Sequence, residues 1–184
     1  MAARLLEKYK SEIVSDLRDK YKYENVMQVP RLDKIVVNMG VGEANTDARV
    51  LEVAIGELAT LSGQKPSARQ ARKSISNFKI REGQKIGCMV TLRGTRMYEF
   101  MDRLFNVAMP RIRDFRGVSD KAFDNSHNYN LGLKEQTMFP EINMDNVSAA
   151  RGMNVTFVFR NMNTREESLD LLRMFGMPFQ KRDN

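Results

Sequence analysis

Apolar residues recur every three or four positions in several stretches of the chain, and this spacing predicts helices. Thr46 or Asp47 can cap the second of these helices, which ends at Gly63. Thr164 and Glu167 form a capping-box pattern at the start of the last one. The expected helices, with their start and stop signals, cover residues 3 to 21, 46 to 63, 95 to 110 and 164 to 176.

Other stretches alternate between apolar and polar residues, which predicts strands with one buried face. They are LDKIVVNMG at 32 to 40, GCMVTLRG at 87 to 94, NYNLGLKE at 128 to 135 and MNVTFVFRN at 153 to 161. Helices and strands intermingle without strict strand–helix–strand order. The pattern therefore predicts an α+β fold, with a mostly antiparallel sheet, helices packed on one face and a protruding basic loop.

Length and composition predict one globular domain that spans residues 1 to 184. Hydrophobic residues make up 42% and charged residues 29% of the chain, which is a composition typical of folded proteins. Cys88 is the only cysteine, so an intramolecular disulfide is excluded and a reducing compartment such as the cytoplasm is favoured. We find no signal peptide and no apolar run long enough for a membrane span, and expect no membrane partner.

The net charge of +7 is concentrated in one short segment. Residues 65 to 96 hold nine Lys or Arg and a single acidic residue, whereas the rest of the chain is almost neutral. Evenly spread charge would indicate only solubility. Charge concentrated beside a neutral body is typical of a surface that binds a polyanion.

The side chains that usually carry catalysis are scarce. His127 is the only histidine and lies in a polar loop, where a solvated histidine is commoner than a catalytic base. Cys88 falls on the apolar face of its strand and is interpreted as a small buried hydrophobe. One histidine and one cysteine do not form a typical zinc site. We therefore expect no enzyme, no catalytic residue, no metal and no cofactor.

Three details of the basic segment favour RNA over a merely solvated surface. Phe78 and Ile80 interrupt the charges at strand spacing, so an aromatic ring is available for base stacking. REGQ at 81 to 84 predicts a turn that would present the charges on a hairpin or loop. The polar faces of the two clearest strands offer hydrogen-bonding groups from Lys34, Asn38, Thr91 and Arg93.

Several long motifs of the chain closely resemble the family of bacterial large-subunit ribosomal protein five. The resemblance runs over nearly the whole chain. It rests on MQVPRLDKIVVNMGVGEA (27 to 44), ARKSISNFKIREGQKIGCMVTLRG (71 to 94), PRIRDFRGV (110 to 118), FPEI (139 to 142), RGMNVTF (151 to 157) and GMPF (176 to 179).

This resemblance implies binding of 5S ribosomal RNA (5S rRNA) in the central protuberance of the large subunit. It also implies contacts with 23S ribosomal RNA (23S rRNA) and with P-site transfer RNA (P-site tRNA), and a bridge to small-subunit ribosomal protein thirteen. The family positions for 5S rRNA match Lys34, Asn38, Gln64, Phe78 and Thr91, and the loop that reaches toward tRNA matches residues 73 to 85.

The full set of expected RNA-binding residues combines these matches with the charges. For ribosomal RNA it comprises Lys34, Asn38, Gln64, Arg69, Arg72, Lys73, Phe78, Thr91 and Arg93, and for tRNA it comprises Lys79, Arg81, Gly83 and Lys85.

Two other classes of function remain open in the sequence. GVGEAN, at 40 to 45, follows a strand and precedes a helix, which is the context of a nucleotide-binding turn, although Asn45 occupies the third glycine position. A nucleotide-binding enzyme would use this turn to hold phosphate. A protein-interaction module would instead use exposed apolar residues of RIRDFRGV, at 111 to 118.

Overall fold

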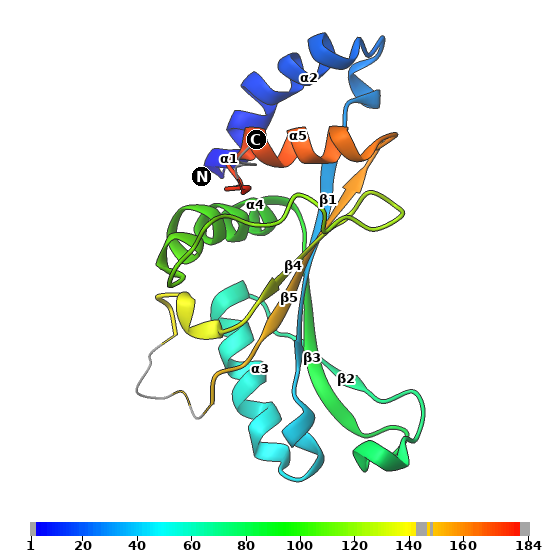
Figure 1. Ribbon diagram of the computed structural model, residues 1–184, viewed down its shortest axis with the longest axis vertical. Coiled ribbons are helices and arrows are strands. Elements are labelled where there is room, and N and C mark those ends of the chain that lie inside the picture. Colours follow the sequence, from blue (N-terminus) through cyan, green and yellow to red (C-terminus); the bar gives the residue numbers. More distant parts are fainter. Residues whose placement is uncertain (1–2, 143–146, 148, 181–184) are drawn as a thin grey trace. The chain divides into compact units, whose positions relative to one another are not determined.

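The computed structural model describes residues 3–142, 147 and 149–180. Within this part of the chain, five strands form one antiparallel sheet in the order β2-β3-β1-β5-β4 (Figure 1). The α+β class is confirmed. The strands are β1 Arg31–Gly40, β2 Ser67–Gln70, β3 Lys85–Leu92, β4 Tyr129–Leu133 and β5 Met153–Arg160.

The chain divides into two compact units. Unit 1 contains residues 1–35, 92–131 and 156–184, and unit 2 contains residues 36–91 and 132–155. Every crossing from one unit to the other falls inside a strand, namely β1, β3, β4 or β5.

We therefore expect residues 1 to 184 to unfold as one domain, because β1, β3, β4 and β5 each continue from one unit into the other. Thermal unfolding followed by circular dichroism and by calorimetry should give coincident single transitions. Two separated transitions would show that the units fold independently.

The helices of unit 1 meet around the ring of Phe175. The N-terminal helical run consists of α1 Arg4–Lys8, a π-helical turn at Tyr9–Ile13 and α2 Val14–Tyr21, which confirms the helix expected over 3 to 21. Phe175, at the end of α5 Arg165–Phe175, lies 6.0 Å from the ring of Tyr9 and 5.9 Å from that of Tyr98. Tyr98 belongs to α4 Gly94–Arg103, which continues as a π-helical segment before the helical run ends at Arg111.

The N-terminus of α5 has the capping box predicted from the sequence, with one change in the partner of Glu167. The Thr164 hydroxyl accepts a hydrogen bond from the Glu167 N–H. The Glu167 carboxylate accepts one from the N–H of Asn163, one residue earlier than the usual capping box. Gly176 ends the helix with φ near 96°, a conformation that favours glycine.

Unit 2 packs α3, Ala48–Ser62, against the buried face of its strands. Asp47 caps the helix by accepting a hydrogen bond from the Arg49 N–H at 2.9 Å, and Gly63 ends it, as the sequence predicts. Burial raises the pKa of Cys88 to about 11, and the Glu57 carboxylate of α3 adds to the effect. A thiol with so high a pKa is a poor nucleophile, so Cys88 is a core residue, as expected.

β2 is a strand that the alternation pattern does not predict. It pairs antiparallel with β3, so that Ser67 lies opposite Met89 and Arg69 lies opposite Gly87, with an irregularity after Arg69. Because directly opposed residues share a face of the sheet, Arg69 lies on the face that also carries Met89. The Arg69 guanidinium lies 3.6 Å from the Met89 sulfur.

Candidate nucleic-acid interface

The connection from β2 to β3, together with Lys85 at the start of β3, carries much of the excess positive charge; residues 71 to 85 are called the cationic loop below. In Figure 1 it forms the green segment that joins the ends of these two strands. Five of its side chains are exposed cations, namely Arg72, Lys73, Lys79, Arg81 and Lys85. Arg69 of β2 is a sixth exposed cation beside them.

None of these six cations pairs with a carboxylate within the described residues, whereas basic residues elsewhere do. Arg4 pairs with Asp102 at 2.5 Å, and Lys20 pairs with Asp170 at 2.5 Å. Unpaired cations close together repel each other and attract polyanions. The loop is therefore suited to bind phosphate groups.

Hydrogen bonds fold the cationic loop into a defined shape. At its base, the Ala71 N–H donates to the Gln84 carbonyl at 2.8 Å, and the Gly83 N–H donates to the Ala71 carbonyl at 3.0 Å. Further out, Ile75 and Ile80 exchange two backbone hydrogen bonds of 2.9 and 3.1 Å. Gly83 has φ near 79° in the turn expected at 81 to 84, so glycine is favoured there.

Phe78 ends a short 3-10 helix, Ser76–Phe78, at the outer part of the loop. The expectation that Phe78 and Ile80 lie at strand spacing is therefore wrong for Phe78, because the chain coils between the paired residues Ile75 and Ile80. The Phe78 side chain is 69% exposed, which rules out a core role. An exposed ring among cations can stack on an RNA base.

Two expected hydrogen-bonding residues of unit 2 lie in contact. The Gln64 side-chain amide donates to the Thr91 carbonyl at 3.4 Å, and both residues are half-buried. Asn38, on the neighbouring strand β1, is half-buried between Val37 and Met39, which are fully buried. Its side chain therefore points to the face opposite the core.

Two other expected residues belong to unit 1. Lys34 is half-buried on β1, and Arg93 is exposed just before α4. They occupy the polar positions of their segments, as the alternation predicts. Their participation in the same RNA surface as Asn38 and Thr91 stays a prediction.

The GVGEAN turn does not have the geometry of a nucleotide site. Residues Gly42–Asn45 form a 3-10 turn, and the helix that follows begins only at Ala48. The N-terminus of that helix is occupied by the Asp47 carboxylate, which would repel a phosphate group. The Asn45 side chain is engaged with the cationic loop instead.

The alternative based on RIRDFRGV also loses support. In this segment Val118 is buried, Ile112 and Phe115 are half-buried, and the exposed side chains are charged. Val118 pairs with the C-terminal stretch, since its N–H donates to the Pro178 carbonyl at 2.9 Å. The segment therefore presents arginines rather than an apolar surface.

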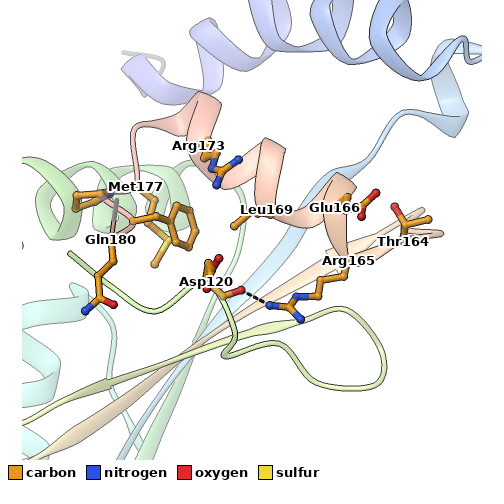
Figure 2. Close-up of a pocket in the computed structure, with 10 residues that line it drawn as sticks. Asp120, Thr164, Arg165, Glu166, Leu169, Arg173, Met177 and Gln180 are labelled. Carbon is orange, nitrogen blue, oxygen red and sulfur yellow. Dashed lines mark hydrogen bonds between the residues drawn. The ribbon is translucent and has the colours of Figure 1, made fainter. Parts of the chain in front are cut away.

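A hollow in unit 1 is a separate feature (Figure 2). Its lining mixes the acidic side chains of Asp120 and Glu166 with the basic ones of Arg165 and Arg173. The Arg165 guanidinium donates to the Asp120 carbonyl, which ties α5 to the neighbouring loop. Charges of both signs do not favour a polyanion, and none of the expected RNA-binding residues lines this hollow.

The described part of the chain gives no sign of a metal site or of a membrane-spanning helix. No three His, Cys, Asp or Glu side chains gather there as metal ligands would. No described helix is both long and apolar enough to cross a bilayer. His127 lies in a polar loop, where its backbone N–H donates to the Asp124 carbonyl at 3.0 Å.

Sequence reasoning missed two residues that shape the interface, Asn45 and Gln84. Their side-chain amides connect the GVGEAN turn to the cationic loop. The sequence carries only a weak signal for these two residues. It is an asparagine at the third glycine position of the fingerprint, and a glutamine that ends the turn Arg81–Glu82–Gly83.

Comparison with known proteins gives one consistent result. The family model described as ribosomal protein L5 matches residues 25–81, and the model described as the ribosomal L5P family C-terminus matches residues 85–179. Proteins named large ribosomal subunit protein uL5 are 56% identical in Clostridium kluyveri, over 99% of this chain and 100% of that protein, and 55% identical in Clostridium acetobutylicum, over 97% and 99%. The protein of that name in Pediococcus pentosaceus is 56% identical, over 98% and 100%.

Proposed function

We propose that this chain, which belongs to the ribosomal protein L5 family and is a structural protein of the large ribosomal subunit, binds 5S rRNA and anchors it in the central protuberance. Family membership confirms that the chain is an RNA-binding component of the ribosome and not an enzyme. A ribosomal protein acts in the cytoplasm, as the single cysteine suggests.

The observation that carries the proposal is the cationic loop with its exposed ring. Six exposed cations that pair with no carboxylate of the described residues lie in and beside one loop, together with a phenylalanine that is 69% exposed. Cations neutralise phosphates and an aromatic ring stacks on a base, and the two together are the usual means of binding single-stranded or looped RNA. The proposed 5S rRNA surface comprises Lys34, Asn38, Gln64, Arg69, Arg72, Lys73, Phe78, Thr91 and Arg93.

Further contacts of the same protein are proposed from the family resemblance. The part of the loop that contains Lys79, Arg81, Gly83 and Lys85 would contact the backbone of P-site tRNA, because exposed cations on a turn fit phosphates without reading bases. Contacts with 23S rRNA and a bridge to small-subunit protein thirteen are proposed on the family resemblance alone.

The proposal is tested by identifying the RNA that the protein selects. The tagged protein is mixed with total RNA from ribosomes in moderate salt, and the RNA that it retains is sequenced. We expect strong enrichment of 5S rRNA over fragments of 23S and 16S rRNA. Retention of all RNAs in proportion to their abundance would contradict specific 5S binding.

Replacing Phe78 by alanine should weaken 5S rRNA binding by about 1–3 kcal/mol, which is the usual worth of stacking one base on an aromatic ring. The melting temperature should barely change, because the ring is exposed and its loss leaves no cavity. Affinity is measured by filter binding, and stability is measured by thermal unfolding.

Two further variants at this position separate stacking from simple apolar contact. Phe78→Trp keeps a flat ring and should retain the affinity, whereas Phe78→Leu keeps apolar volume and should behave like alanine. Unchanged RNA affinity in Phe78→Ala, or full affinity in Phe78→Leu, would defeat the stacking proposal.

A further inference from the structure

Two neutral side chains, Asn45 and Gln84, connect the cationic loop to the turn that precedes α3. The Asn45 amide nitrogen donates to the Lys79 carbonyl at 2.7 Å and to the Phe78 carbonyl at 3.3 Å. The Gln84 amide nitrogen donates to the Asn45 carbonyl at 3.2 Å and also to the Asn45 side-chain oxygen. We call this pair of side chains the amide bracket.

The bracket also closes the loop on itself. The Gln84 side-chain oxygen accepts a hydrogen bond of 3.1 Å from the Arg81 N–H. The bracket thus reaches the backbone at Phe78, Lys79 and Arg81, the outer part of the loop. Both bracket residues are half-buried, while the cations around them are exposed.

The loop needs such a bracket because its own charges oppose a compact shape. Five cations between residues 72 and 85 repel one another, and only Glu82 offsets them. Lys79 is held at φ near 53°, a conformation that a lysine rarely adopts. Hydrogen bonds from the Asn45 side chain to the Phe78 and Lys79 carbonyls, which lie on either side of the Lys79 Cα, stabilise this backbone.

The chemistry of the bracket suits a loop that must receive phosphates. Carboxylates only accept hydrogen bonds, so they could not donate to the Phe78 and Lys79 carbonyls, and they would also neutralise the cations and repel RNA. Amides donate and accept hydrogen bonds without any charge. The loop therefore keeps its full positive charge while its backbone is held.

We propose that Asn45 and Gln84 are positioning residues that hold the cationic loop in its RNA-binding conformation before RNA arrives. The part of this statement that concerns RNA rests on the proposed function. The part that concerns the loop does not. A loop that is ordered in advance loses less conformational entropy on binding, so its affinity for RNA is higher at the same charge.

The first experiment uses the protein alone. Trypsin cleaves after Lys and Arg, and the loop offers Arg72, Lys73, Lys79 and Arg81. In Asn45→Ala, Gln84→Ala and the double variant, we expect cleavage in the loop to be about tenfold faster than in the wild type, because cleavage needs local opening. Because both side chains belong to one network, the double variant should show less than the product of the single effects.

Asn77→Ala is the matched control. Asn77 is an exposed asparagine in the same loop, and its side chain makes no hydrogen bond within the described residues. Its loss should leave the cleavage rate unchanged. Cleavage after Lys10, in the N-terminal helical run, reports on any general loss of stability. Equal loop cleavage in the wild type and in the bracket variants would overturn the proposal, and so would an equal rise at Lys10.

The second experiment measures affinity for 5S rRNA as a function of salt. Because the bracket variants keep every cation, the slope of log affinity against log salt should stay the same while the affinity falls about threefold to tenfold. Faster cleavage with unchanged affinity would overturn the positioning role. Failure of the wild type itself to bind would count against the proposed function, while the cleavage result would still decide whether the bracket orders the loop.

Discussion

Raising the salt concentration from about 50 to about 200 mM should weaken 5S rRNA binding by roughly 10²- to 10³-fold, as expected for about five phosphate contacts. The number of contacts comes from the five cations of the proposed 5S rRNA surface, namely Lys34, Arg69, Arg72, Lys73 and Arg93. Each phosphate contact releases condensed counterions, so log affinity should fall linearly with log salt. Filter binding over a salt series measures the slope.

Charge variants show where the slope arises. Arg72→Gln combined with Lys73→Gln should reduce its magnitude by about one for each cation that contacts a phosphate. Lys10→Gln removes an exposed lysine from the N-terminal helical run and should leave the slope unchanged. A flat salt response of the wild type would reject the electrostatic part of the interface. Equal slopes for all variants would show that the two substituted cations of the loop contact no phosphate of 5S rRNA.

The elements that the sequence predicts well are those whose signals are local. β1 carries three fully buried residues, Ile35, Val37 and Met39, at strict alternation. α3 begins after Asp47 and ends before Gly63, as their capping chemistry indicates. A cap or a period can be read from a few neighbouring residues, so these elements need no knowledge of distant parts of the chain.

β2 and the shape of the cationic loop depend on partners that are distant in sequence. β2 has no alternation of its own and exists because Ser67–Gln70 pairs with β3. Phe78 coils into a 3-10 turn because the Ile75–Ile80 pair closes the chain around it. The amide bracket joins residues that are more than thirty positions apart in the chain. No local sequence pattern predicts such contacts.

The candidate site also combines features that can be predicted from the sequence with features that depend on the fold. Charge and residue type identify the cationic loop from the sequence, because an excess of positive charge in 32 residues is visible without any fold. Whether Phe78 is buried in the core or exposed for stacking depends on how the loop is folded, and its 69% exposure decides that question. Residue type therefore predicts the kind of partner, whereas tertiary contacts determine the geometry offered to it.

The tRNA contact is best tested by neutralising the loop rather than by shortening it. Shortening would remove Phe78 and the backbone carbonyls that the amide bracket holds, so that 5S rRNA binding would change as well. The side chains of Lys79, Arg81 and Lys85 make no hydrogen bond within the described part of the loop. Replacing all three by glutamine therefore keeps the loop's backbone hydrogen bonds and removes only charge.

Ribosomes that carry the Lys79→Gln, Arg81→Gln, Lys85→Gln protein should release P-site tRNA roughly 10²-fold faster, because three phosphate contacts of roughly 1 kcal/mol each are lost. The dissociation rate of labelled tRNA measures this, and the 5S rRNA content of the same particles shows whether assembly is intact.

The matched control replaces Lys10 and Lys22, which are exposed cations of unit 1, by glutamine. Faster release with full 5S rRNA content would assign these charges to tRNA. An unaltered release rate would exclude a role of these charges in holding tRNA. Neutral side chains at 79, 81 and 85 leave Phe78 and its backbone in place. Loss of 5S rRNA would therefore show that the same cations serve both RNAs.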